Sequence, residues 1–312
     1  MEAYFVAPYF SDQVVKAICW TLVHSLWIGL IVAALAGLVI GATKRSTANL
    51  RYNLLCGILL LFMVLIVFTF YKELNIASKS ADRPQIQITG TVQNITVGNT
   101  GITTNAFLFN QLVSFLNRSS GWIVMLWLLC FAFKSIKLTR ELLYVRRVRS
   151  CGVSATDEAW QNKVSALSKK LGIRRAVTLL ESELVKVPVT IGYLKPVILL
   201  PLGMLLQLSP GQAESIIYHE LAHILRRDYL INILQSIVET VFFFNPAIWW
   251  LSALIREERE TCCDDIVLAH VVQKRNYLEA LMAFQNYENP LGNYAMGLSL
   301  RRPQLMNRLR RM

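Results

Sequence analysis

The sequence predicts an α+β integral membrane protein, in which three transmembrane helices precede a domain outside the bilayer that contains a small β-sheet. Of its 312 residues, 54% are hydrophobic, and the mean hydropathy is +0.42, which is high for a soluble domain. The apolar residues gather into runs long enough to span a bilayer, and after about residue 138 the pattern becomes that of a water-soluble domain. We therefore expect a membrane domain at 1–137 and a second domain at 138–300.

Three apolar runs are the expected transmembrane helices. A helix needs about 20 residues to cross the hydrocarbon core. We place the spans at about 17–42, 53–71 and 121–137. His24 lies in the first span, where the sequence is equally compatible with a functional histidine and with a packed, hydrogen-bonded one.

The basic residues orient these spans. Lys44 and Arg45 follow the first span, and a larger basic cluster between Lys134 and Arg149 follows the third. Because lysine and arginine accumulate in cytoplasmic loops, both segments are expected in the cytoplasm and segment 72–120, with its hints of short strands, outside. The net charge of +12 is then explained by residues that flank the lipid bilayer. No nucleic-acid-binding module is recognisable in the sequence, so no nucleic-acid partner is expected.

The second domain begins with helical and then strand patterns. A basic helix at 138–148 continues the third span, and an amphipathic helix follows at 157–171. Runs rich in β-branched and leucine residues predict a small β-sheet. Its strands are expected at about 176–180, 187–192 and 196–201.

The next helix carries the residues with the clearest chemistry. Ser209 is expected to cap it, and Pro210 fits its first position. His219 and His223 are four residues apart, so they share one helix face and both imidazoles can reach one Zn2+ ion. Glu220 lies beside them, where it can take a proton from a zinc-bound water. The alternative is a pair of histidines on the polar side of an ordinary helix.

A fourth apolar run at 229–255 is expected to be a helical hairpin instead of a span. Asn245-Pro246 interrupts the run, and proline breaks the hydrogen-bond ladder of a helix. A straight helix would also carry the chain to the side of the membrane opposite His219. A turn at 244–246 returns the chain to the side that it left.

This hairpin places a third zinc ligand beside the two histidines. A zinc site with two histidines needs one more protein ligand and a water, and Glu260 is the candidate. Asp264 lies one helical turn later, where it can hydrogen-bond a ligand histidine. The alternative for Glu260 is a solvated charge cluster with Glu257 and Glu258.

Several motifs together resemble the membrane metallopeptidases of the BlaR/MecR type, which are bacterial β-lactam-sensing signal transducers and their relatives. The resemblance covers roughly 15–300 and is weakest in 72–120. It includes the strand pair at 188–201 and the first-span motif His24-Ser25-Leu26-Trp27. The motifs that carry it are His219-Glu220-Leu221-Ala222-His223, Phe244-Asn245-Pro246-Ala247-Ile248-Trp249-Trp250 and Arg259-Glu260-Thr261-Cys262-Cys263-Asp264.

The resemblance implies a zinc peptidase domain of the gluzincin type. Its zinc ligands would be His219, His223 and Glu260, its catalytic base Glu220 and its supporting carboxylate Asp264. The strand residues Thr190, Ile191 and Gly192 would hold a substrate as an added strand.

The same resemblance implies a multi-pass protein of the bacterial inner membrane, with its active site on the cytoplasmic side. The substrate would be a cytoplasmic repressor, with self-cleavage near 299–301 and a homodimer as further options. In this family a span and an extracellular penicillin-binding sensor follow the zinc domain. The basic tail at 301–312 is of the kind that precedes a span, which indicates a truncated chain or a relative without the sensor.

Two alternatives to a signalling peptidase stay open at this point. One is a constitutive protease for the quality control of membrane proteins. The other is a membrane transducer without catalysis, in which zinc is structural. A structural site would need a fourth protein ligand, which His270, Cys262 or Cys263 would have to supply.

Overall fold

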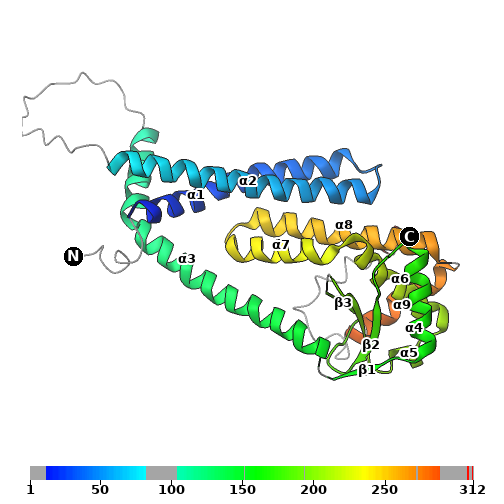
Figure 1. Ribbon diagram of the computed structural model, residues 1–312. Coiled ribbons are helices and arrows are strands. Elements are labelled where there is room, and N and C mark those ends of the chain that lie inside the picture. Colours follow the sequence, from blue (N-terminus) through cyan, green and yellow to red (C-terminus); the bar gives the residue numbers. More distant parts are fainter. Residues whose placement is uncertain are drawn as a thin grey trace, which may run out of the picture.

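Three long helices precede a smaller α/β region in the computed structural model of the protein (Figure 1). The structure describes residues 12–81, 104–150, 152–192, 194–271 and 273–288, together with Arg308 and Arg311. The short strands expected within segment 72–120 lie in residues outside this description, as does the expected self-cleavage position. The description therefore includes all the predicted spans and the whole His219–Asp264 region.

The long helices are α1 (Asp12–Ala42), α2 (Ala48–Ala81) and α3 (Thr104–Ser150). Each contains a segment that is long and apolar enough to cross a membrane, so the structure has three candidate membrane-spanning helices where the sequence predicts spans. α1 and α2 pack against each other along their lengths, whereas α3 crosses α1 and then runs to the sheet (Figure 1). α3 extends beyond the predicted third span on both sides, and the basic helix predicted at 138–148 is continuous with it.

A four-stranded mixed sheet forms the centre of the α/β region. Its strand order is β1-β2-β4-β3; β2 and β4 are parallel, and the other two pairs are antiparallel. β2 begins two residues later than expected, at Thr178, because pairing with β4 starts where Thr178 lies opposite Val197. The strands are β1 (Val153–Ala155), β2 (Thr178–Ser182), β3 (Val189–Ile191) and β4 (Val197–Pro201).

Helices cover both faces of this sheet. Successive strand residues point to opposite faces, so Ile198 and Leu200 pack into the core that α4 and α6 share. Val197 and Leu199 pack on the other face with Val148, near the end of α3. The helices of the region are α4 (Glu158–Lys170), α5 (Met204–Gln207), α6 (Pro210–Arg226) and α9 (Lys274–Glu288).

The beginning of α6 follows the sequence closely. The Ser209 hydroxyl accepts a hydrogen bond from the Gln212 amide, and the Gln212 side chain accepts one from the Ser209 amide. This reciprocal cap satisfies two amide groups that a helix start leaves unpaired. The helix ends at Arg227, whose φ of 60° turns the chain directly into the next helix.

Residues 228–270 form two helices joined by a short turn, α7 (Asp228–Val241) and α8 (Pro246–His270). The turn at 242–245 lies where Asn245-Pro246 interrupts the apolar run. The side-chain amide of Gln235 donates to the Ser252 carbonyl at 3.1 Å, so the two helices face each other along the hairpin. The hairpin shares one apolar core with α1 and α2, in which Leu55, Phe62, Phe242 and Leu251 are buried. The chain therefore comes back toward α6 along α8 (Figure 1).

Candidate metal centre

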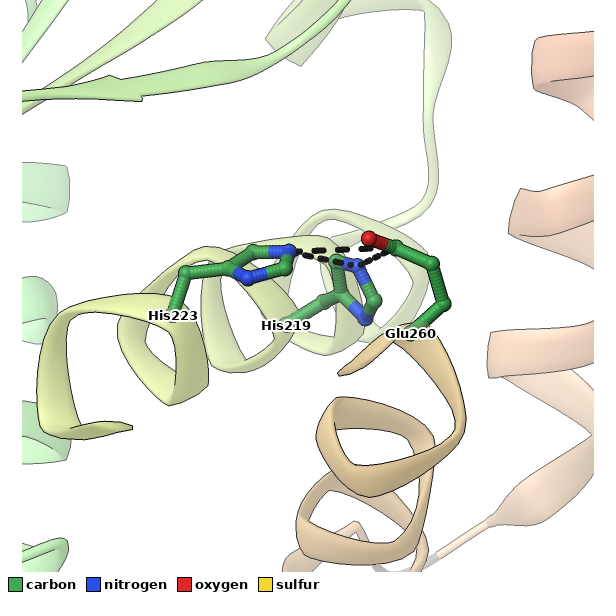
Figure 2. A group of neighbouring side chains, drawn as sticks. All are labelled: His219, His223 and Glu260. Carbon is green, nitrogen blue, oxygen red and sulfur yellow. Dashed lines mark hydrogen bonds and ion pairs between the residues drawn. The ribbon is translucent and has the colours of Figure 1, made fainter. Parts of the chain in front are cut away.

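Three side chains from two helices converge at one point. Figure 2 shows His219 and His223 of α6 and Glu260 of α8 directed toward one another. The Nε2 atoms of the two histidines are 3.3 Å apart. Oε2 of Glu260 lies 3.4 Å from His219 Nε2 and 3.9 Å from His223 Nε2. The structure thus brings together the three residues that the sequence predicts as ligands.

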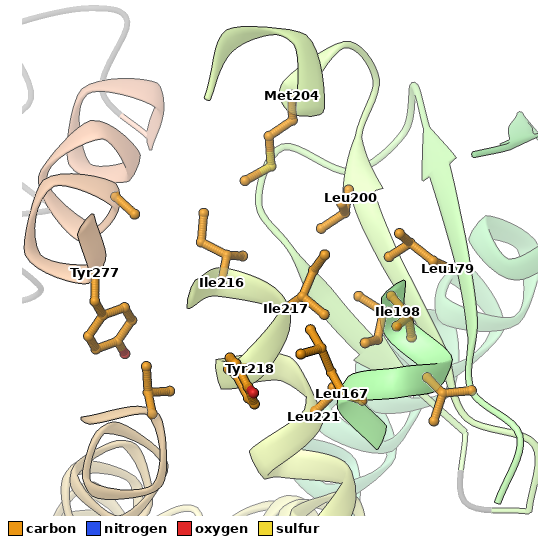
Figure 3. Close-up of a cluster of buried hydrophobic side chains, with 14 of the residues drawn as sticks. Leu167, Leu179, Ile198, Leu200, Met204, Ile216, Ile217, Tyr218, Leu221 and Tyr277 are labelled. Carbon is orange, nitrogen blue, oxygen red and sulfur yellow. The ribbon is translucent and has the colours of Figure 1, made fainter. Parts of the chain in front are cut away.

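Packing on the opposite face of α6 fixes this convergence. Ile217 and Leu221 are fully buried against the sheet residues Leu179, Ile198 and Leu200 (Figure 3). Since residues three and four apart share a helix face, burying this face turns the two histidines to the other side. That side faces α8, which carries Glu260.

The donor set and its spacing fit a zinc ion. Two imidazole nitrogens and a carboxylate oxygen are ligands that catalytic zinc sites use, and at ~2.0–2.1 Å from a tetrahedral ion such atoms lie about 3.3 Å apart. The distances between the donor atoms are 3.3, 3.4 and 3.9 Å. His219, His223 and Glu260 can therefore hold one metal ion, while their role as zinc ligands stays a prediction.

The pKa of Glu260 reflects this environment. Burial raises the pKa of the carboxyl group, but the hydrogen bond from His219 and the charges of His223, His219 and Arg308 outweigh it. The result is a pKa well below the ordinary range. Glu260 is therefore a carboxylate at neutral pH, as a metal ligand must be.

Glu220 is held from the edge of the sheet. The Thr190 hydroxyl of β3 donates to Oε2 of Glu220 at 2.7 Å, and Glu220 is buried. β3 is at one end of the strand order, so Thr190 joins the sheet edge to the helix that carries the histidines. Ile191 is buried beside it, and Gly192 has a φ of 91° that favours glycine.

A chain of hydrogen bonds supports His219 from behind. Its Nδ1 lies 2.9 Å from the Tyr277 hydroxyl, which in turn donates to Oδ1 of Asp264 at 2.6 Å. Asp264 itself is 3.6 Å from His219 Nδ1, which is too far for a hydrogen bond. The carboxylate expected to contact a histidine directly therefore acts through Tyr277.

His223 has a carboxylate of its own. Its Nδ1 lies 2.8 Å from Oδ2 of Asp228, the first residue of α7. Tyr52 of α2 donates to the other oxygen of Asp228 at 3.4 Å, and the Arg226 guanidinium lies at the same distance. A carboxylate behind a ligand histidine fixes its tautomer and ring orientation, so each histidine of the site has such a support.

Cys263 lies on the Asp228 side of His223. Its Sγ is 3.4 Å from His223 Nδ1 and 3.5 Å from Asp228 Oδ2. Burial raises the pKa of the Cys263 thiol to about 11, more than the favourable charge of His223 lowers it. A protonated thiol that faces Nδ1 belongs to the support of His223 and not to the ligand cluster at Nε2.

Several of these residues carry no sequence signal that would have identified them. Tyr277 reaches the site from α9, Asp228 lies beyond the left-handed residue at Arg227, and Arg308 lies 44 residues from its partner Asp264. Only Asp228 is close to the motif in sequence. Because the helix of the motif ends before Arg227, helix periodicity does not predict that the Asp228 side chain contacts His223.

Nearly the whole chain, with the metal cluster included, is similar to one protein family. The family model described as BlaR1 peptidase M56 matches residues 18–310, which is nearly the whole chain. The chain belongs to the BlaR1 peptidase M56 family. The match covers the three long helices, the hairpin and the metal cluster alike, so the sequence-based recognition of this family is confirmed.

Similar proteins of known name point to the same group. The regulatory protein BlaR1 of Bacillus licheniformis is 33% identical over 118 residues, which are 37% of this chain and 20% of that protein. The methicillin resistance mecR1 protein of Staphylococcus aureus is 22% identical over 270 residues, 82% of this chain and 45% of that protein. The chain therefore spans less than half the length of these relatives. With the three apolar helices, the matches support a signal-transducing role of the metallopeptidase type at a membrane.

Proposed function

We propose that this chain is a zinc-dependent membrane endopeptidase that cleaves a cytoplasmic regulatory protein. The single observation that carries the proposal is the cluster of His219, His223 and Glu260 (Figure 2), with Glu220 next to His219 in the chain. It combines three metal donors from two helices with a second carboxylate, Glu220, on the helix that carries both histidines. Catalytic zinc sites use three protein ligands and leave a position for water.

The residues divide the chemistry between them. Zinc held by the three ligands would polarise the scissile carbonyl and activate water for attack. Glu220 takes the proton from that water and passes it to the leaving amine. The Thr190 hydroxyl, at 2.7 Å from Glu220 Oε2, holds the carboxylate in place for both transfers.

The substrate would bind along the β3 edge of the sheet. Among the strands that the structure describes, β3 pairs only with β4, and Thr190 at its centre contacts Glu220. An extended segment added to β3 through main-chain hydrogen bonds would pass directly over the catalytic carboxylate. Thr190, Ile191 and Gly192 are the residues that such a strand would contact.

The surroundings of the site favour a catalytic over a structural zinc. A structural site is closed by a fourth protein ligand. Cys263 faces the wrong nitrogen of His223, and Nδ1 of His270 is 2.8 Å from the Ile266 carbonyl of its own helix. Among the residues that the structure describes, a second group that could hold a metal consists of His223, Asp228 and Cys263. Asp228 and Cys263 lie at Nδ1 of His223, so they add no fourth ligand to the group of His219, His223 and Glu260.

The cytoplasmic location rests on the distribution of charge and on the relatives. Lysine and arginine follow the first span and the third, as the positive-inside rule expects of cytoplasmic segments. The relatives are a regulatory protein and a methicillin resistance protein by name. A cytoplasmic regulator, and the chain itself, are therefore the proposed substrates.

Metal analysis and cleavage assays on the same preparations test this proposal. Membranes that contain wild type or Glu220→Gln, each with tags at both ends, would be assayed for self-cleavage and for cleavage of an unfolded casein. The wild type should bind one zinc ion and cleave, and Glu220→Gln should bind zinc without cleaving. Equal cleavage by both chains, or a wild type without metal, would overturn the proposal.

A further inference from the structure

Arg308, near the C-terminal end of the chain, contacts the support of the metal centre. Its Nε donates to Oδ2 of Asp264 at 2.8 Å, and one terminal nitrogen donates to Oδ1 at 2.6 Å. The same nitrogen lies 3.3 Å from the Tyr277 hydroxyl. This is a two-pronged arginine–carboxylate pair, the geometry that gives such pairs both strength and orientation.

Hydrogen bonds connect Arg308 to the predicted ligand His219 through Asp264 and Tyr277. When Nε2 of His219 faces a metal, its Nδ1 carries the proton and donates to the Tyr277 oxygen at 2.9 Å. The Tyr277 hydroxyl then has one proton left to donate, and it goes to Asp264 at 2.6 Å. Arg308 donates to both oxygens of Asp264, so each contact in the series from His219 to Arg308 joins a donor to an acceptor.

A second arginine of the same segment provides an internal comparison. Arg311 forms an ion pair with Asp265 at 2.6 Å, next to the Arg308–Asp264 pair. The two pairs differ in burial: the side chains of Arg308 and Asp264 are 17% and 5% exposed, those of Arg311 and Asp265 40% and 49%. Exposed pairs contribute little, whereas removing one partner of a buried pair is costly.

We propose that Arg308 is a positioning residue of the metal centre. By fixing Asp264 it holds the Tyr277 hydroxyl, and through Tyr277 it holds the ring of His219. The inference rests on the proposed metal-dependent function and adds a regulatory property to it. The position of Arg308 and the geometry of the metal site are therefore coupled.

Zinc and cobalt binding to the purified full chain in detergent test this inference. The metal would be removed with a chelator, and Zn2+ would be titrated back in competition with a fluorescent zinc indicator. Arg308→Ala should weaken zinc binding about 10- to 100-fold, as the loss of partners behind a ligand histidine does. Arg311→Ala, which removes the exposed pair, should leave zinc affinity unchanged.

Two further variants keep the test decisive. Arg308→Ala leaves Asp264 buried without its partner, so the chain could lose its fold. Tyr277→Phe keeps the ring and removes only the hydroxyl, and it should also weaken zinc binding about 10- to 100-fold. Arg308→Lys, which keeps the charge without the two-pronged geometry, should restore affinity in part.

The absorption spectrum of bound Co2+ reports ligand geometry independently of activity. It should change in Arg308→Ala and Tyr277→Phe and stay that of the wild type in Arg311→Ala. Wild-type affinity and spectrum in folded Tyr277→Phe, or equal effects of Arg308→Ala and Arg311→Ala, would overturn the inference alone. A wild-type chain that binds neither Zn2+ nor Co2+ would overturn the proposed function and this inference with it.

Discussion

Asn245, in the turn of the α7–α8 hairpin, donates a hydrogen bond from Nδ2 to the main-chain oxygen of Ser25 at 2.8 Å. Its Oδ1 accepts one from the Ala247 amide at 3.0 Å and so caps α8. At the end of α7, the Val241 carbonyl accepts a hydrogen bond from the Trp127 indole of α3 at 3.1 Å. Polar groups of the backbone are thus paired at a turn packed between apolar helices, as a membrane environment requires.

Gly29 provides the space for Asn245, and replacing it should displace the hairpin. A Cβ atom at this position would lie 2.6 Å from Asn245 Nδ2 and 2.8 Å from Oδ1. Moving the amide breaks both of its hydrogen bonds, so we expect Gly29→Ala to cost about 1–3 kcal/mol. Thermal unfolding in detergent would measure this loss. Gly57→Ala, where a Cβ atom meets nothing within 4 Å, should be neutral or stabilise α2.

Thr190 should matter for cleavage but not for metal binding. Hydrogen bonds to charged groups contribute about 1.5–3 kcal/mol, so Thr190→Val should lower kcat roughly 10- to 100-fold. Thr190→Ser keeps the hydroxyl and should retain most of the activity. The zinc content of both variants should equal that of the wild type. A Thr190→Val enzyme with unchanged kcat would show that the contact with Glu220 has no part in catalysis.

His219, His223 and Glu260 could be predicted from the sequence because their positions follow from local patterns in the chain. The spacing of His219 and His223 follows from helix periodicity, and the break at Asn245-Pro246 implies a return of the chain toward them. Glu260 is then at the right distance along α8. The hairpin supports this sequence of steps, since α8 starts at Pro246 and carries Glu260 to the histidines.

The residues behind the ligands could not be predicted in the same way. Tyr277, Asp228 and Arg308 reach the site through tertiary packing, and no local pattern distinguishes them from other tyrosines, aspartates and arginines. The sequence predicts that the basic tail precedes a span, and it gives no sign that two of its arginines pair with Asp264 and Asp265. The charge of a segment indicates that it lies in water or at a membrane surface. It does not indicate which carboxylates its arginines pair with.

The second span should influence the metal site through Asp228. Asp228→Asn removes the carboxylate that accepts from His223 Nδ1, so zinc affinity should fall about 10- to 100-fold. Tyr52→Phe removes a single hydrogen bond to the same carboxylate, which is long and therefore weak at 3.4 Å, and should cost about two- to tenfold. Competition with a zinc indicator measures both.

The matched control for Tyr52 lies in the same helix. Tyr71 of α2 is 63% exposed, and Tyr71→Phe should leave zinc affinity unchanged. If Tyr52→Phe and Tyr71→Phe bind zinc equally well, α2 does not contribute to the support of His223. Loss of binding in Tyr71→Phe as well would indicate a general disturbance of α2.

Metal binding should stabilise the fold through Glu260 but not through Glu220. A ligand that binds only the folded state adds about 2.7 kcal/mol of stability at 100 times its Kd, so the thermal midpoint of the wild type should rise with free Zn2+ and fall with a chelator. Glu220→Gln keeps all three donors and should show the same dependence. Glu260→Gln loses the carboxylate ligand, and its midpoint should respond little to zinc. A full zinc response in Glu260→Gln would mean that the carboxylate on α8 is not a ligand, and it would leave only the two histidines to hold the ion.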